Sequence, residues 1–154
     1  MSKKKILFVC LGNICRSPLA EGIAKVINTE KNLECIIVSS GTSSWHEGEV
    51  PCQDSIKVAK LNGIDISKQR ARQVKASDKE MFDYIITMDA SNKKNLEEIG
   101  FKKIYLLGEF ANYGSRDVPD PYFFDTFDDG IKKVYMMIDQ CVQDLLYQID
   151  EGTI

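Results

Sequence analysis

A thiol and a guanidinium share one short segment, Cys10-Leu-Gly-Asn-Ile-Cys-Arg16-Ser17. The apolar run Ile6–Val9 precedes this segment and a Ser-Pro helix start follows it, so we expect a strand, a turn and a helix capped by Ser17. Amides at a helix N-terminus bind anions, and arginine matches phosphate oxygens with a planar fork. These groups also favour the thiolate form of cysteine, which is the nucleophile. The segment predicts an enzyme that attacks phosphorus through Cys10, with Arg16 binding the phosphoryl group.

The loop residues have separate expected roles. Successive N–H groups can ring the non-bridging oxygens of a phosphoryl group. The predicted phosphate-binding set is Leu11, Gly12, Asn13, Ile14, Cys15, Arg16 and Ser17. Gly12 permits a backbone turn that other residues resist, and Asn13 tolerates left-handed geometry and can pin the loop. Ser17 either caps the helix or donates a hydrogen bond to the Cys10 sulfur, and both roles can hold.

A proton donor for the leaving group is expected in the segment Asp117-Val-Pro-Asp-Pro-Tyr122. Tyrosine leaves poorly as an anion because its pKa is about 10, so a general acid of fixed reach is needed. Asp120 lies between prolines that stiffen its loop, and it is the predicted acid, with Asp117 and Asp125 as competing donors. Three aromatic residues could line a pocket for a flat ring or simply pack: Trp45, Tyr122 and Phe123.

Length and composition are those of an ordinary globular chain. The 154 residues fit one domain, 1–154, with 44% hydrophobic and 28% charged residues. The net charge of −3 argues against binding to nucleic acid or to membrane phosphates. The apolar run after the basic N-terminus is too short for a signal peptide or a membrane span, so we expect a cytoplasmic protein. We also expect a monomer. The cysteines are not clustered and His46 is the only histidine, so no metal site is expected.

Apolar β-branched runs alternate with amphipathic segments along the chain. Strands are expected at 5–10, 35–38, 84–88 and 103–107, and helices at 17–30, 52–61, 91–98 and 128–149. A capping box should start a short helix at 77–80, and Asn62-Gly63 should end the helix before it. The alternation predicts an α/β fold: a doubly wound, four-stranded parallel sheet flanked by helices, flavodoxin-like, with the phosphate loop after the first strand. In such a sheet the polar loops at the carboxyl ends of the strands converge on one site.

The Cys10–Ser17 segment with Pro18-Leu-Ala-Glu21 resembles the signature of the low-molecular-weight protein tyrosine phosphatases. The resemblance covers essentially the whole chain, including Asp120-Pro121-Tyr122, Ser39-Ser40, Trp45, Ala71-Arg72-Gln73 and Met88-Asp89-x-Ser91-Asn92. It implies that Cys10 forms a phosphocysteine, that Arg16 binds the phosphoryl group and that Asp120 protonates the leaving oxygen and then activates water. Phosphotyrosine proteins and small aryl phosphates are the implied substrates, inorganic phosphate is the product, and no metal or organic cofactor is expected.

The resemblance also implies roles for other residues around the loop. The residues that shape the loop would be Asn13, Ser17 and Ser40, and those that wall the pocket would be Leu11, Ile14, Trp45, Tyr122 and Phe123. Cys15 is either a small buried residue or, as the resemblance supports, a resolving thiol that captures oxidised Cys10 as a reversible disulfide. Gln69 stands where many relatives have a histidine that orders the loop, which leaves open how the loop is tied to Asp89.

Other functions remain open at this stage. A subgroup of arginine-phosphate phosphatases resembles this chain but carries threonine where it has Ile14, and an apolar side chain there suits an aromatic ring better than a guanidinium. A thiol-coupled arsenate reductase resembles it in the Cys–Arg loop but needs a distal pair of cysteines, and residues 53–140 contain none. A phosphate-binding adaptor without turnover would not need Cys10, Arg16 and Asp120 together.

Overall fold

The computed structural model describes residues 3–121, 124, 126 and 130–154. Within these residues, parallel strands form one four-stranded sheet: β1 (Lys5–Cys10), β2 (Ile36–Gly41), β3 (Tyr84–Thr87) and β4 (Ile104–Leu106). Their order is β2-β1-β3-β4, so the chain places β2 on one side of β1 and then crosses to add β3 and β4 on the other. The doubly wound parallel fold is therefore confirmed. The direction of chain connection changes at β1, and in such folds ligands bind at the carboxyl ends of the strands beside this switch point.

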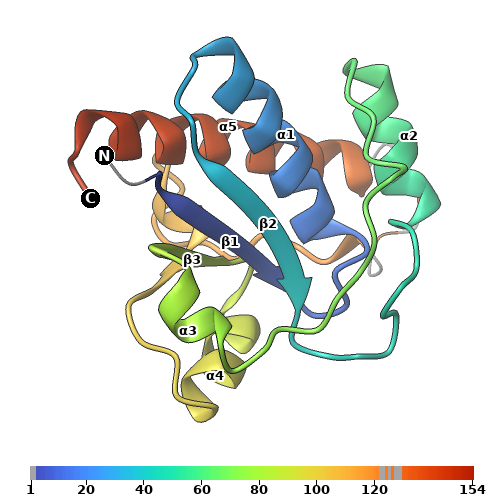
Figure 1. The fold of residues 1–154 in the computed structure, drawn as a ribbon. Coiled ribbons are helices and arrows are strands. Elements are labelled where there is room, and N and C mark those ends of the chain that lie inside the picture. The colour runs from blue at the N-terminus through green and yellow to red at the C-terminus, as the bar shows by residue number, and fades with distance from the viewer. Residues whose placement is uncertain (1–2, 122–123, 125, 127–129) are drawn as a thin grey trace.

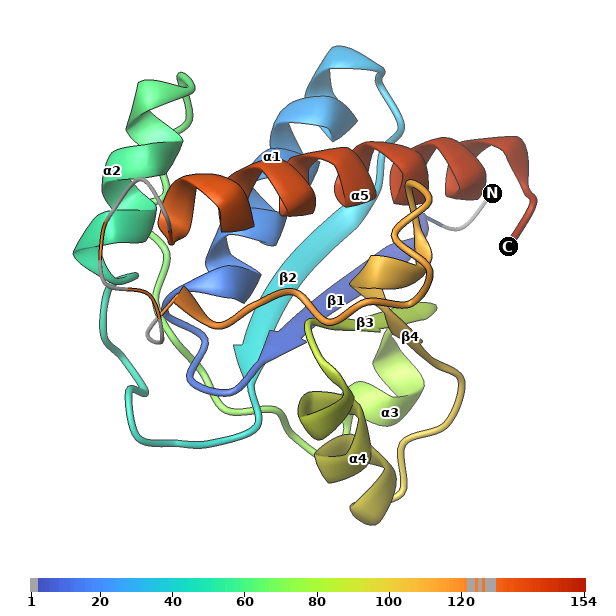
Figure 2. The same cartoon turned by 180° about the vertical axis from the view of Figure 1, so that it is seen from behind.

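Helices cover both faces of the sheet (Figures 1 and 2). One face carries α1 (Arg16–Glu30), α2 (Gln53–Leu61) and α5 (Ile131–Glu151), and the other carries α3 (Asp78–Met81) and α4 (Ala90–Glu98), while a short 3-10 turn, η1 (Leu107–Glu109), follows β4. Ile6 and Phe8 of β1 belong to the core with α1 and α5. Leu7 and Val9 belong to the core on the opposite face, because side chains alternate along a strand. In the described part of the chain, no helix combines the length and the apolar character needed to cross a membrane.

The first helix and the second strand differ from the sequence prediction. Helix α1 begins at Arg16 with Cys15 as its N-cap, so the prediction of Ser17 as the cap is wrong. The Ser17 hydroxyl lies 3.0 Å from Cys10 Sγ instead. Strand β2 begins at Ile36 and continues to Gly41, past the predicted end, because residues 39–41 pair in register with residues 8–10 of β1. Pairing to a central strand outweighs the weak strand propensity of Ser-Ser-Gly.

The later helices also show where local signals succeed and fail. Helix α2 ends before Asn62 and Gly63, as predicted, and Gly63 takes the left-handed φ of 78°. The capping box expected at 77–80 is wrong, because the Ser77 side chain makes no cap hydrogen bond. The Asp78 carboxylate instead accepts the Lys75 N–H (2.8 Å) and is paired with Arg72 (3.1 Å). Helix α5 starts at Ile131 rather than 128, and residues 128 and 129 lie outside the described residues.

Candidate active site

The loop between β1 and α1 is bound from its outer side by two neighbouring segments. The pairs are Thr42 N to Cys10 O (3.0 Å), Ser43 N to Leu11 O (2.9 Å), Cys52 N to Ile14 O (2.7 Å) and Ser55 Oγ to Cys15 O (3.0 Å). Because these carbonyls are held outward, the loop amides are left for an anion at its centre. One of them, the Asn13 N–H, donates to Cys10 Sγ over 3.2 Å.

Cys10 ends β1 and is buried, with 3% of its surface exposed. Its sulfur receives the Asn13 N–H and lies 3.0 Å from Ser17 Oγ. Asn13 Nδ2 donates to that same hydroxyl oxygen over 2.8 Å, so the hydroxyl hydrogen is left for the sulfur at 3.0 Å or for the Ser40 carbonyl at 3.5 Å, and the sulfur is the nearer acceptor. Two donors at the sulfur stabilise a thiolate, both before attack and when it departs.

Asn13 is the left-handed residue of the loop, at φ 57°. Its side chain ties the loop to the rest of the site, because Nδ2 also donates to Ser39 Oγ (2.9 Å) and Oδ1 accepts the Arg72 N–H (2.9 Å). The turn expected at Gly12 is wrong in this respect, since Gly12 has no positive φ. Close packing is the better reason for a glycine at position 12, because a Cβ there would lie 3.0 Å from His46 Cδ2.

Arg16 is buried and oriented by partners on the other side of the site. Its Nη1 donates to Asp89 Oδ2 (2.7 Å) and to the Val118 carbonyl (2.9 Å), and its Nη2 lies 3.9 Å from Asp120 Oδ2. Burial alone would lower the pKa of Arg16, but the negative charges of Cys10, Asp89 and Asp120 outweigh it and raise that pKa. The guanidinium is thus fixed and charged before any substrate arrives.

Of the three aspartates considered as proton donors, Asp120 lies at the site. Its side chain is 30% exposed and lines the same cavity as Cys10. Asp117 accepts the Ala90 N–H over 3.0 Å at the start of α4, and it is not among the residues that line this cavity. Asp125 lies outside the described residues.

The cavity above the loop has a volume of about 360 Å³. It is lined by Cys10, Leu11, Gly12, Ile14, Cys15, Arg16, Trp45, His46 and Asp120. Trp45 is 79% exposed, so it can cover a ligand only from the mouth. Tyr122 and Phe123, the other predicted wall residues, lie outside the described residues. His46 also lines the cavity, which the sequence did not predict, although its neighbour Trp45 in the loop after β2 was a signal for this segment. His46 Nδ1 lies 2.9 Å from Glu49 Oε2.

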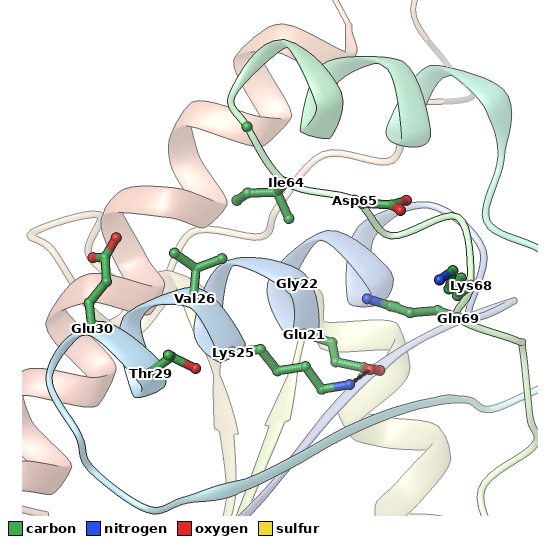
Figure 3. Close-up of a pocket in the computed structure, with 11 residues that line it drawn as sticks. Glu21, Gly22, Lys25, Val26, Thr29, Glu30, Ile64, Asp65, Lys68 and Gln69 are labelled. Carbon is green, nitrogen blue, oxygen red and sulfur yellow. Dashed lines mark hydrogen bonds and ion pairs between the residues drawn. The ribbon is translucent and has the colours of Figure 1, made fainter.

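A chain of hydrogen bonds runs from the phosphate loop to the outer face of α1. Ser39, which receives the Asn13 amide, donates to Glu21 Oε1 (2.5 Å), and Lys25 Nζ pairs with Glu21 Oε2 (2.5 Å). Glu21 and Lys25 line a second cavity of about 590 Å³ between α1 and the segment after α2 (Figure 3). Gln69 lines it as well, and its Oε1 is buried without a hydrogen-bond partner among the described residues. Ser40 lies in β2 opposite Val9.

A thiol, a fixed guanidinium and a carboxylate around an anion cradle define the class of cysteine-dependent phosphatases. The family model described as low molecular weight phosphotyrosine protein phosphatase matches residues 5–153. A low molecular weight phosphotyrosine protein phosphatase of Schizosaccharomyces pombe is 39% identical in an alignment 153 residues long that covers 94% of this chain and 96% of the relative. The chain belongs to this family, and it is a phosphatase that hydrolyses phosphotyrosine in phosphoproteins and releases phosphate.

Solved structures share the fold over nearly the whole chain. A protein tyrosine phosphatase of Entamoeba histolytica, crystallised with Hepes in the active site, superposes with a TM-score of 0.91 at 34% identity, covering 99% of this chain and 100% of its own. A Drosophila arginine phosphatase superposes with a TM-score of 0.87 at 32% identity, covering 94% of this chain and 97% of its own. The predicted family, fold and activity are confirmed, while the fold itself is shared with an enzyme of different substrate.

Proposed function

We propose that hydrolysis proceeds through a phosphocysteine on Cys10, with Arg16 binding the phosphoryl group and Asp120 acting as the general acid. The observation that carries this proposal is that all three side chains line one cavity above the loop. In the first step the Cys10 thiolate attacks phosphorus, and the S–P bond forms as the P–O bond breaks. Asp120 gives its proton to the leaving oxygen, while Arg16 and the loop amides hold the remaining phosphoryl oxygens.

Water completes the second step. The Asp120 carboxylate takes a proton from water, the oxygen attacks phosphorus, and the S–P bond breaks to release phosphate. The departing Cys10 thiolate is stabilised by the Ser17 hydroxyl and the Asn13 N–H, which already contact the sulfur. These contacts support a role for Ser17 in both steps of the reaction rather than in capping the helix.

The walls of the cavity support an aromatic leaving group. Leu11, Ile14 and Trp45 surround the entrance to Cys10, and each offers apolar surface to a flat ring. The phosphoarginine alternative would bring a guanidinium against Ile14, which cannot accept its hydrogen bonds. We therefore propose phosphotyrosine over phosphoarginine as the preferred phosphoprotein residue.

The setting of the enzyme is part of the same proposal. We propose a monomer of one domain, 1–154. We also propose a cytoplasmic location, because all five cysteines are free thiols and such usage fits a reducing compartment. The net charge of −3 supports the expectation that neither nucleic acid nor a membrane surface is a partner. Light scattering at several protein concentrations tests the monomer.

The nucleophile is tested by Cys10→Ser. In chelator-treated buffer the wild type should turn over an aryl phosphate at its full rate, and the variant should lose activity by about 10⁴-fold or more. Cys35→Ser, just before β2 and away from the cavity, is the matched control and should keep wild-type activity. Turnover by Cys10→Ser near the wild-type rate, or a need for added divalent metal, would contradict the mechanism. Comparing phosphotyrosine and phosphoarginine peptides tests the substrate class.

A further inference from the structure

Cys15, the last residue of the phosphate loop, contacts Cys52 at the N-cap of α2, and the hydrolysis described above uses neither thiol. Cys15 Sγ donates to Cys52 Sγ over 2.6 Å, and both residues are only partly buried. The contact is braced by the backbone, because Cys52 N–H donates to Ile14 O (2.7 Å) and Ser55 Oγ donates to Cys15 O (3.0 Å). The two sulfurs are therefore held together by bonds that do not involve them.

We propose that Cys15 and Cys52 form a reversible disulfide that joins the phosphate loop to α2, a modification site separate from Cys10. A disulfide requires an S–S distance of about 2.05 Å, so sulfurs already in contact need only a small approach. The inference rests on the proposed function only in taking Cys10 as the phosphate-transferring thiol.

The two thiols are chemically unequal. The hydrogen bond from Cys15 lowers the pKa of Cys52 to about 6, against the opposing effect of burial and with further help from Ser55. The same hydrogen bond, together with burial, raises the pKa of Cys15. Cys52 is also the N-cap residue of α2, where the helix dipole favours a negative charge. The contact therefore polarises the pair, with Cys52 as the thiol that ionises more readily and Cys15 as the thiol that keeps its proton.

Hydrogen peroxide supplies the oxidant. The Cys52 thiolate attacks one peroxide oxygen, the O–O bond breaks, and the departing hydroxide takes a proton to leave as water. The Cys15 sulfur then attacks the Cys52 sulfenic acid, so the S–S bond forms as the S–O bond breaks, and the proton of Cys15 leaves with the hydroxyl as a second water. The two sulfurs together lose two electrons, which reduce one peroxide to water.

Cys10 is left out of this reaction by its own contacts. Its sulfur is bound by Ser17 and Asn13, whereas the sulfur of Cys15 is bound to Cys52. A Cys15–Cys52 disulfide leaves the nucleophile free. A Cys10–Cys15 disulfide, which the family resemblance implies, would remove it. The two outcomes are therefore separated by activity as well as by mass.

The test uses the Cys10→Ser/Cys35→Ser double variant, in which trypsin gives peptides 6–16 and 32–57 with one cysteine each. After peroxide, the intact protein should lose the mass of two hydrogens and the two peptides should be linked until dithiothreitol is added. The same variant with Cys52→Ser should give no link. Because the double variant is inactive under the proposed mechanism, a failure here would not bear on hydrolysis. Peptides that stay separate, with both thiols open to alkylation, would overturn the proposal.

Two further measurements do not depend on that variant. In wild-type protein treated with peroxide while inorganic phosphate occupies the loop, the linked form should keep its activity within about twofold, since the sulfurs need little movement. Loss of activity through a disulfide that contains Cys10 would overturn the proposal. The alkylation rate of Cys52 should rise with pH through a midpoint near 6, and Cys15→Ser should move that midpoint upward. An unchanged midpoint would contradict the thiol–thiolate pair.

Discussion

The phosphate loop and the segment that carries Asp120 meet at one cavity but are held in different ways. The loop is bound along its outer side by the residues after β2 and by the start of α2, and its central Asn13 is bonded to the backbone of Arg72. The acid segment is anchored at Val118, whose N–H donates to Met88 O (2.8 Å) and whose carbonyl accepts Arg16. Asp120 itself is 30% exposed. Phosphate binding is therefore built into the frame of the sheet, while proton transfer depends on the placement of a surface segment.

Among changes that compare the two regions, the largest effect should come from Arg16, which contacts both. Arg16→Lys keeps the charge but cannot contact Asp89, Val118 and a phosphoryl group together, so kcat/KM should fall by about 10³-fold on every substrate. Arg70→Lys, on an exposed side chain that bonds the Ser67 carbonyl, is the matched control and should leave kcat/KM unchanged. A loss limited to poor leaving groups would place Arg16 with the acid segment instead.

Removing the acid should separate the two regions. Asp120→Asn should lower kcat about 10²-fold on phosphotyrosine, whose leaving group needs a proton, and only a few-fold on an aryl phosphate with an acidic phenol. Binding of inorganic phosphate should not weaken, because the loop is intact. An equal loss on both substrates would mean that Asp120 is not the proton donor.

A smaller loss is expected when the loop is loosened from within. Asn13→Ala removes the hydrogen bonds to Ser17, Ser39 and Arg72, and kcat should fall about tenfold, which corresponds to about 1.4 kcal/mol. Asn13→Gly loses the same bonds but suits the φ of 57°. Thermal unfolding should therefore show the alanine variant as the less stable of the two. If both variants unfold at the same temperature, the left-handed backbone contributes nothing to stability.

The smallest effect should come from the aspartate that sequence could not distinguish from the acid. Asp117 bonds the Ala90 N–H, so Asp117→Asn should change kcat by less than about twofold at any leaving group. A dependence on leaving group in this variant would move the acid assignment from Asp120 to Asp117.

The sequence was most informative where chemistry and local structure depend on the same few residues. The strand that ends in Cys10, the loop to Arg16 and the helix after it follow from residues that are adjacent in the chain, and so does the stop at Gly63. Asp120 was predicted as the acid from the two prolines that flank it, and the family resemblance implied the same role. The parallel direction of the strands followed from their alternation with helices.

What the sequence could not indicate depends on contacts between distant segments. From the sequence, Ser17 and Ser77 both resemble helix caps. In the structure the Ser17 hydroxyl contacts the Cys10 sulfur, and the nearby Lys75 N–H donates to Asp78 rather than to Ser77. Ser39 accepts a hydrogen bond from Asn13 only because β2 extends past its predicted end and pairs with β1. Cys52 had no signal of its own, since nothing in its neighbours places it against Cys15.

Because neighbouring segments bind the loop carbonyls on the outer side, the loop amides form an anion site that also binds the product. A cradle that is complete before a ligand arrives fits any tetrahedral dianion of the right size, so the released phosphate binds it as well as the phosphoryl group of a substrate does. Inorganic phosphate is then a competitor of the substrate and occupies part of the enzyme. Selection between the two falls to the apolar walls of Leu11, Ile14 and Trp45, which only the substrate reaches.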